Sequence, residues 1–360
     1  MARRNFNPRF DTVRPAGIAY CENPHDVSEC LNFVRRFGLP VTPRCGGHSY
    51  TGASLVPGLV IDVSPMSAIR ADAPSETATI GAGARLIDVY DKLSAADVSI
   101  PAGSCPTVGI SGLTLGGGIG VVSRAHGVLS DNLRAIELVT ADGRKLTCDA
   151  KNNSDLFWAC RGGGGATFGV VTSFTFATHP TSEIVVFFLN WPWSAARSAI
   201  DAWQHSREPE YAASQIFTRP MDGTAIDTIL AAVQRRGGLS GGGQGGIALD
   251  ALGGAVNRVA PDATALVHRN GLFNAQITTT WTTDAPTDAI RAQQNWLRSL
   301  HAAMKPSASG QAYQNYADAG LTDWKQAYFG ANYPRLLTVK NRYDPDRVFR
   351  IPQTVGTATK

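Results

Sequence analysis

The stretch of the chain with the clearest potential for chemistry is residues 101–120, PAGSCPTVGISGLTLGGGIG, which combines one cysteine with seven glycines. Glycine lets the main chain approach a ligand closely and adopt positive φ angles without a steric penalty. A cysteine thiolate is a good nucleophile. Seven glycines around Cys105 therefore predict a backbone that lies against a large, flat ligand with a thiol beside it. The alternative is a glycine-rich surface loop.

A second segment, residues 44–50 (RCGGHSY), places a histidine directly after a Gly-Gly pair. The segment follows a short predicted strand, and successive small residues of this kind can aim several backbone N–H groups at one anion. It therefore predicts an anion site that suits a pyrophosphate. His48 taken by itself would more often be an ordinary polar loop residue, so its importance depends on the segment around it.

The elements that must position these segments alternate between helix and strand. An Asn-Pro start at residue 23 and Gly38 at the end bound one amphipathic helix, and residues 86–93 form another. Strands are expected at residues 39–43, 59–64 and 78–83. This alternation is typical of an α/β or α+β domain.

The same unit continues to the sequence Thr178-His179-Pro180, where a domain boundary is expected. Two strands, residues 135–140 and 145–148, read as a hairpin with an Ala-Asp-Gly turn. A short helix over residues 154–160 and a strand over residues 168–177 follow.

Residues 184–312 have a different pattern of predicted elements, which indicates an antiparallel sheet with helices on one side. We expect strands at residues 184–193 and 275–281 and helices at residues 196–204 and 228–234. Residues 235–246, RRGGLSGGGQGG, read as a flexible linker. The G-x-G-x-x-G match inside it lacks a preceding strand and a following helix, so it is not a dinucleotide fingerprint. In the C-terminal tail, helices are expected at residues 323–329 and from 334 to about 342.

Composition narrows the class of protein. With 360 residues, 43% hydrophobic and 17% charged, the chain is globular and has a substantial core. The net charge is +4 and the basic residues are scattered along the chain, which argues against a nucleic-acid-binding surface. No apolar run approaches the ~20 residues that a membrane span needs. Six cysteines show no zinc-like spacing, and five of them read as small buried hydrophobes. The Arg3-Arg4 pair is not followed by the apolar run of an export signal. The sequence therefore leaves the cellular location of the protein open, and a cytoplasmic location is expected if the N-terminus is complete.

Taken together, the two glycine segments resemble the berberine-bridge-enzyme-like family of the vanillyl-alcohol-oxidase/PCMH flavoprotein superfamily. Members that share this pattern carry FAD attached twice, through the histidine of R-x-G-G-H and the cysteine of G-x-C-x-x-V-G, which are His48 and Cys105 here. The resemblance implies bonds from His48 to the flavin 8α-methyl carbon and from Cys105 to flavin C6. The alternative for Cys105 is a buried structural cysteine.

The resemblance covers about residues 5–180 and 246–355 and implies an α+β fold. A PCMH-type FAD-binding domain of two α/β subdomains is expected over residues 1–180. A reduced antiparallel-sheet substrate domain with helices on one face is expected over residues 181–312, and residues 313–360 are expected to return to the FAD domain.

The resemblance also implies a set of cofactor contacts beside the two attachment residues. They are Arg44, Cys45, Gly46, Gly47, Ser49 and Tyr50, then Gly103, Ser104, Val108, Gly109, Gly112, Gly116, Gly117, Gly118 and Gly120, and finally Val170, Val171, Tyr328 and Asn332. The glycines and Val108 are expected to seat the flavin ring and the phosphates on backbone, and the two valines to lie beside the adenine end.

Tyr316 matches a position where some relatives carry a tyrosine base. A base is needed because removal of hydride from an alcohol carbon leaves positive charge unless the hydroxyl proton departs. Free tyrosine ionises only near pH ~10, so this role requires a cationic neighbour. The alternative is a tyrosine that lines the pocket and donates a hydrogen bond. His268 and Arg269 resemble a family segment on the substrate-domain sheet and are expected to hold structure or orient substrate.

The chain departs from the family pattern in its substrate domain, where the interval between Phe217 and Asp250 is compressed. The implied function is that of a flavin-dependent oxidase that acts on a sugar or a secondary-metabolite hydroxyl, with dioxygen as acceptor and hydrogen peroxide as product. The expected partners are this small molecule and dioxygen, with no nucleic acid, membrane or metal. The alternatives are a dehydrogenase with another electron acceptor and an inactive flavin-binding homologue. A carbohydrate-binding module would leave the two glycine segments unexplained.

Overall fold

Helix α1 (Pro24–Phe37) forms where its capping residues predict it. The Asn23 side chain accepts hydrogen bonds from the backbone N–H groups of His25 and Asp26, and Gly38 ends the helix with φ +64°. The buried face of α1 lies beside a parallel three-stranded sheet with the order β1-β3-β2. Its strands are β1 (Gly17–Tyr20), β2 (Val41–Arg44) and β3 (Leu59–Asp62).

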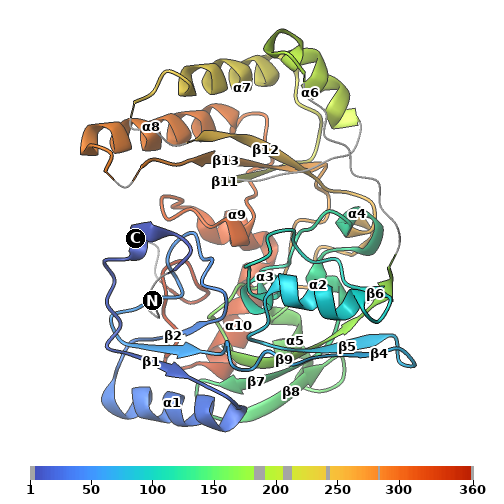
Figure 1. Cartoon of the computed structure of the whole chain (residues 1–360), viewed down its shortest axis with the longest axis vertical. Helices are drawn as coiled ribbons and strands as arrows, with labels where there is room; N and C mark the ends of the chain where they lie inside the picture. Colours follow the sequence, from blue (N-terminus) through green and yellow to red (C-terminus); the bar gives the residue numbers. More distant parts are fainter. Residues whose placement is uncertain (1–4, 182–190, 206–212, 241–243, 283, 358–360) are drawn as a thin grey trace.

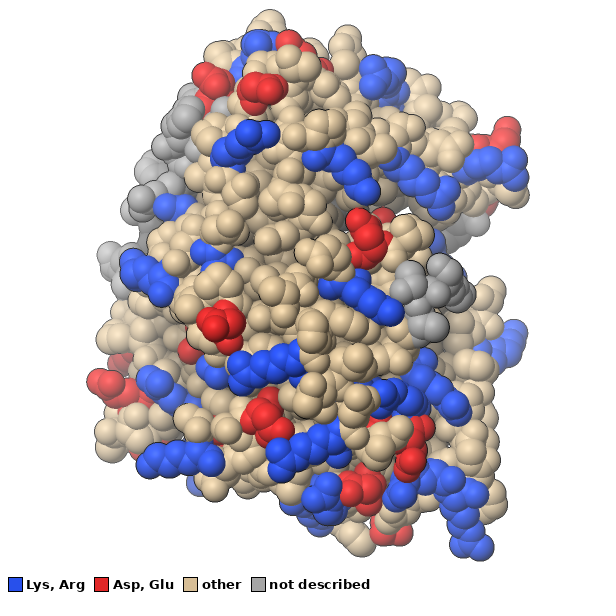
Figure 2. Space-filling view, turned by 180° about the vertical axis from the view of Figure 1, so that it is seen from behind, with Lys and Arg blue, Asp and Glu red and all other residues tan. Residues whose placement is uncertain are grey.

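This computed structural model describes residues 5–181, 191–205, 213–240, 244–282 and 284–357. The chain forms a larger lower unit and a smaller upper unit (Figure 1). Within the described residues, no helix combines the length and the hydropathy that a membrane span requires. Lys and Arg side chains are spread over the whole face seen in Figure 2, with Asp and Glu side chains among them, so the positive charge is not gathered into one patch.

The lower unit also contains an antiparallel five-stranded sheet with the order β4-β5-β9-β7-β8. Its strands are β4 (Ile69–Asp72), β5 (Thr77–Gly81), β7 (Leu133–Thr140), β8 (Lys145–Asp149) and β9 (Gly169–Ala177). The helices of this part are α2 (Leu86–Ser94), α3 (Ile110–Leu115), α4 (Ser123–His126) and α5 (Ser154–Ala159). A two-stranded ladder pairs β6 (Val98–Ser99) with β10 (His179–Pro180). The two expected α/β subdomains are therefore present.

The upper unit is an antiparallel sheet of order β11-β13-β12 with helices on its outer face (Figure 1). The strands are β11 (Ala213–Phe217), β12 (Gly245–Ala251) and β13 (Phe273–Thr279), and the helices are α6 (Ala196–His205), α7 (Gly223–Arg236) and α8 (Thr287–Met304). Side chains alternate along a strand. Phe217, Phe273 and Ile277 form the core under α7 and α8, whereas Asn274 and Gln276 face the lower unit.

The linker expected at residues 235–246 is shorter in the structure, because both ends of this range belong to regular elements. Helix α7 extends to Arg236, and Gly245 and Gly246 already pair with β13. Residues 241–243 lie outside the described part of the chain, as do residues 184–190 of the strand expected at 184–193. Helix α8 was not anticipated, although Trp296, Leu300 and Met304 bury one face at helical spacing.

The C-terminal segment returns to the lower unit through α9 (Trp324–Phe329) and α10 (Tyr333–Tyr343), and α10 packs beside α5. Lys340 and Asp344 form a fully buried ion pair there, and the Lys340 ammonium also donates to two backbone carbonyls. Short 3-10 turns complete the fold at Pro8–Phe10, Leu129–Asn132, Trp193–Ala195, Val256–Arg258, Gln314–Tyr316 and Gly330–Asn332.

Candidate active site

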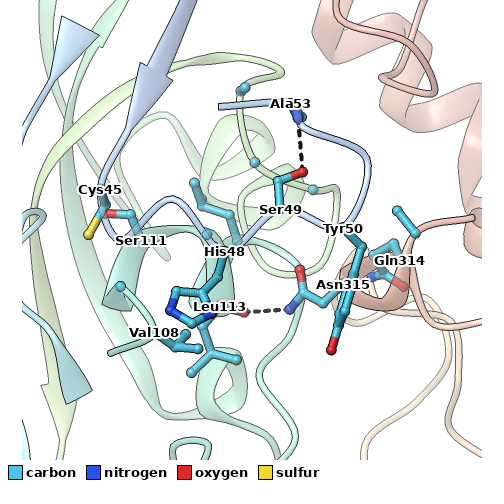
Figure 3. Close-up of a pocket in the computed structure, with 18 of the residues that line it drawn as sticks. Cys45, His48, Ser49, Tyr50, Ala53, Val108, Ser111, Leu113, Gln314 and Asn315 are labelled. Atoms are coloured by element: carbon cyan, nitrogen blue, oxygen red, sulfur yellow. Dashed lines mark hydrogen bonds between the residues drawn. The ribbon is translucent and has the colours of Figure 1, made fainter. Parts of the chain in front are cut away.

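A cavity of about 470 Å³ is lined by segments far apart in the sequence. Residues 43–54 and 103–121 contribute much of its wall, and Asp250, Tyr316 and Tyr328 line it from β12 and the C-terminal segment. Figure 3 shows His48, Tyr50, Val108, Ser111 and Asn315 around it. A volume of this size is within the range of small-molecule and cofactor sites.

The two glycine segments meet backbone to backbone. A Cβ added at Gly46 would lie 2.4 Å from the Gly109 nitrogen, and one added at Gly109 would collide with Cys45 and Gly46. Gly109 also forms an isolated β-bridge with Arg85, at the start of α2. Glycine is therefore required at both positions, because each leaves room for the other segment.

Arg44 and Cys45 line the cavity but are held by other groups. The Arg44 guanidinium forms a buried ion pair with Asp62 at 2.7 Å, which neutralises much of its charge. Burial raises the pKa of the Cys45 thiol to about 11, so this thiol stays protonated near neutrality. Arg44 and Cys45 therefore shape the wall of the expected cofactor site, and neither presents a free charge to it.

His48 is fixed on two sides. Its ring stacks on Phe6 with centroids 4.2 Å apart, and its Nε2 lies 2.9 Å from the Thr107 hydroxyl. Burial, and then the charge of Arg85, lower the pKa of His48, so the imidazole is neutral near pH 7. A neutral imidazole has a lone pair that can bond to an electrophilic carbon.

Cys105 contacts the same hydroxyl, with its Sγ 4.0 Å from Thr107 Oγ1. Thr107 thus bridges the two residues that the resemblance assigns to flavin attachment. Thr107 could not be singled out from the motif, because it occupies one of the unspecified positions in G-x-C-x-x-V-G.

The residues around the cavity suit a flat, extended cofactor. Helix α3 begins after Gly109, inside the glycine-rich stretch, and its turn at Gly112 leaves open space where a Cβ would stand. Most of the expected contacts line the cavity: Arg44, Cys45, Gly46, Gly47, His48, Ser49, Tyr50, Gly103, Ser104, Cys105, Val108, Gly109, Gly112, Gly120, Val170, Val171 and Tyr328. Because most of the residues expected to contact the cofactor line one cavity, the site fits FAD.

Gly116, Gly117 and Gly118 are not among the residues that line the cavity, and their expected contact with the flavin stays a prediction. The Gly118 N–H donates to the Tyr313 hydroxyl at 2.8 Å, and a Cβ at Gly116 would collide with Asn315. Gly117 and Gly118 also have φ angles of +117° and +81°. These glycines therefore position Tyr313 and Asn315, and through them the wall of the cavity.

Asn332 is also separated from the cavity. It is buried, and its Nδ2 lies 2.8 Å from the Pro261 carbonyl oxygen and 3.2 Å from that of Thr264, to both of which it donates. These hydrogen bonds hold residues 261–265 to the C-terminal segment, and the flavin contact expected for Asn332 stays a prediction. Tyr328 does line the cavity, and its hydroxyl accepts a hydrogen bond from the Asp318 N–H.

His268 and Arg269 lie in the irregular segment before β13, not on the sheet where they were expected. The Arg269 guanidinium binds both carboxylate oxygens of Asp131, at 2.6 and 2.8 Å, and is almost fully buried. His268 lies within hydrogen-bond distance of the Gln311 and Gln314 side chains, and burial lowers its pKa. Neither residue lines the cavity. The Arg269–Asp131 pair instead links the segment before β13 to the turn at Leu129–Asn132 in the lower unit.

Tyr316 lines the cavity together with Asp250, a residue that belongs to none of the motifs described above. The Tyr316 hydroxyl donates to Asp250 Oδ2 at 3.4 Å, and the Asn274 side chain donates to the same oxygen at 2.7 Å. Asp250 is only 4% exposed. A carboxylate is thus one partner of Tyr316, a group that the expected base role did not include. The one sequence feature that could have drawn attention to Asp250 is that it is the only carboxylate in the segment GGIALDA.

Tyr50 completes this side of the cavity. Its ring contacts Tyr316 edge to face, and its hydroxyl accepts a hydrogen bond from the Gln276 amide at 3.2 Å. Burial raises the pKa of Tyr50 to about 12, with smaller contributions from Cys105 and Asp250. Tyr50 therefore stays protonated at neutral pH and can donate a hydrogen bond into the cavity.

Two family models match the chain at the segments that form this cavity. An FAD binding domain matches residues 15–149, and a berberine and berberine-like domain matches residues 312–356. The FAD-linked oxidoreductase YgaK of Bacillus subtilis is 31% identical, with 98% of this chain and 94% of the relative covered. That alignment spans 431 positions against the 360 residues of this chain, so the relative has residues without a counterpart here.

Solved structures agree on the fold. Physcomitrella patens BBE-like 1 superposes with a TM-score of 0.83 at 26% identity, over 100% of this chain and 95% of that chain. A xylooligosaccharide oxidase from Myceliophthora thermophila C1, solved with xylobiose, has a TM-score of 0.86 at 22% identity, over 98% of this chain and 94% of that chain. At that identity the likeness shows the fold alone.

Fold and site together define an FAD-linked oxidoreductase with a PCMH-type flavin domain. The chain belongs to the berberine-bridge-enzyme-like family of these flavoproteins.

Proposed function

We propose that this protein is an oxidase that removes hydride from the hydroxyl-bearing carbon of a polyhydroxylated substrate and passes the electrons to dioxygen. The observation that carries this proposal is the Asp250–Tyr316 pair, which lines the same cavity as His48 and Cys105. This pair and the two residues expected to attach the flavin line the same space, which supports the proposal.

FAD, when bound, supplies the hydride acceptor. The neutral His48 ring and the Cys105 thiol are the residues we assign to its covalent attachment. Backbone of the two glycine segments would hold the rest of the cofactor, because their N–H groups can face phosphate oxygens without interference from side chains.

Asp250 is the better proton acceptor of the pair. The Tyr316 hydroxyl donates its hydrogen bond to Asp250 Oδ2, so the carboxylate is the acceptor within the pair. In this arrangement Asp250 takes the proton of the substrate hydroxyl, either directly or through Tyr316, as hydride leaves the carbon. This assignment revises the expectation that Tyr316 itself is the base.

The polar side chains of the cavity favour a substrate rich in hydroxyl groups. Asn274 and Gln276 face the lower unit from β13, and both are almost fully buried. The Asn274 Oδ1 and Gln276 Oε1 atoms have no hydrogen-bond partner among the described residues. Neither residue lines the cavity, so these oxygens are not assigned to the substrate. The polar side chains that do line it, Tyr50, Asp250 and Tyr316, can exchange hydrogen bonds with the hydroxyl groups of a sugar. A sugar is also the ligand named for the xylooligosaccharide oxidase of the same fold.

The test uses Asp250→Asn, Tyr316→Phe and the double variant. Anaerobic bleaching of the flavin by a panel of mono- and oligosaccharides identifies a substrate, and kcat is then compared. We expect Asp250→Asn to lose about 10²–10⁴-fold in kcat, the usual contribution of general base catalysis, and the double variant to lose little more. Asp284→Asn, which changes an exposed carboxylate of the upper unit, is the matched control.

Full turnover by Asp250→Asn would contradict the base assignment. Bleaching without oxygen consumption would identify a dehydrogenase that uses another acceptor. Flavin that no sugar or alcohol bleaches would favour a flavin-binding homologue without this activity.

A further inference from the structure

Two cysteines outside the cavity bring their sulfur atoms together. Cys21 follows β1 directly and Cys30 lies on α1, and their Sγ atoms are 3.9 Å apart with a hydrogen bond between the thiols. All six cysteines lie in the described part of the chain and none forms a disulfide. Among them, this is the pair whose sulfurs are in contact. The proposed oxidase reaction makes no use of either thiol.

The two thiols differ in exposure and in acidity. Cys21 is buried, whereas Cys30 is half-buried and within reach of a small oxidant. The hydrogen bond from Cys21 lowers the pKa of Cys30, although burial and the carboxylates of Asp26 and Glu29 oppose this effect. The same hydrogen bond raises the pKa of Cys21. Cys30 is therefore the sulfur that an oxidant would meet first, and Cys21 is the thiol placed to attack it.

We propose that Cys21 and Cys30 form a reversible disulfide that ties β1 to α1, with a hydroperoxide as the oxidant. Cys30 attacks one peroxide oxygen and becomes a sulfenic acid while the O–O bond breaks and one water leaves. Cys21 then attacks the Cys30 sulfur, and the hydroxyl leaves as a second water. Two thiols are oxidised by two electrons, and one hydrogen peroxide is reduced to two waters. The final S–S distance is ~2.05 Å, so the sulfurs must approach by about 2 Å.

The position of the pair gives the bond a consequence for the cavity. The Cys21 backbone N–H donates to the Asp62 carbonyl at 2.9 Å, and the Asp62 side chain holds Arg44 at the start of the RCGGHSY segment. Strand β1 pairs with β3 and β3 pairs with β2, which leads into that segment. The disulfide would therefore brace the subdomain that carries His48.

The first test is mass spectrometry on the whole purified protein before and after hydrogen peroxide. Residues 10–35 remain on one tryptic peptide because Arg14 precedes proline, so both cysteines are measured together. We expect this peptide to become lighter by two hydrogen atoms and to lose its reaction with a thiol-alkylating reagent. Dithiothreitol should reverse both changes. The peptides with Cys148 and Cys160, both of which are buried, serve as controls in the same sample and should still be alkylated after denaturation.

The second test is thermal unfolding of the oxidised and reduced forms, with Cys30→Ser as the matched variant. Closing a loop between these residues should raise the unfolding midpoint of the wild type by several degrees after peroxide and leave Cys30→Ser unchanged. Added hydrogen peroxide supplies the oxidant, so the result does not depend on the proposed oxidase activity. Persistence of both free thiols, or addition of oxygen to each cysteine separately without a bond, would overturn the proposal.

Discussion

At the scale of residues, the site depends on a few small groups that orient the reactive ones. Thr107 contacts both His48 and Cys105, and Phe6 covers one face of the imidazole. If the Thr107 hydroxyl accepts the Nε2 hydrogen, the lone pair of His48 is on Nδ1. A single hydroxyl would then determine which ring nitrogen can bond to a flavin.

We expect Thr107→Val to slow covalent attachment at His48 about tenfold or more, because the ring loses the group that fixes its tautomer and orientation. The measurement is the fraction of His48 peptide that carries flavin, followed by mass spectrometry after FAD is added to cofactor-free protein. Thr107→Ser keeps the hydroxyl and should restore the wild-type rate. Equal attachment rates in the wild type and Thr107→Val would remove this role from Thr107, and a wild type without any attachment would instead contradict the assignment of His48.

At the scale of elements, the cavity wall requires two chain segments to approach without side chains between them. The RCGGHSY segment follows β2, and the GSCPTVG segment leads into α3, so their separation is set by the elements on either side. Gly46 and Gly109 meet at this crossing, where a methyl group at either position would overlap backbone of the other segment.

Gly46→Ala should therefore separate the two segments and greatly reduce the flavin bound per protein, while the rest of the core survives. The ratio of flavin to protein absorbance after purification measures this effect, and thermal unfolding reports on the fold. Gly246→Ala is the matched control, because its Cβ would meet nothing within 4 Å. Normal flavin content in Gly46→Ala would show that the segments can separate without loss of the site.

At the scale of the whole molecule, residues 252–272 of the upper unit reach down to the lower unit. The Trp158 indole donates to the Asp262 carbonyl at 2.7 Å, and Arg269 pairs with Asp131 across 138 residues of sequence. Asp131 belongs to the turn after α4, which follows the glycine-rich stretch. The placement of the upper sheet over the cavity therefore depends on a buried ion pair.

Removal of one partner should leave the other charge buried without compensation, so we expect Arg269→Met to lose about 3–5 kcal/mol in the free energy of unfolding. Urea unfolding measures this loss. The control is Arg144→Met, which breaks the exposed pair with Asp142 and should cost less than about 1 kcal/mol. A similar small cost for both variants would mean that the Arg269 pair does not hold the units together.

Local sequence determined most of the lower unit. Asn23, Pro24 and Gly38 bound α1 because capping and positive φ depend on adjacent residues. The Ala-Asp-Gly turn likewise joins β7 and β8 as expected. The two glycine segments identified the flavin domain, since a backbone that must approach a ligand requires glycine wherever the chain comes close.

Only the tertiary structure shows that Tyr316 contacts Asp250 and that Arg269 is buried against Asp131. It also shows that Gly116, Gly117 and Gly118 contact Tyr313 and Asn315 and do not line the cavity. These outcomes depend on contacts between segments that are distant in the sequence, and burial and charge pairing are properties of the packed molecule. The spacing of residues along the chain determined which elements form. Which side chains share a cavity, and with what charge beside them, was decided by how those elements pack.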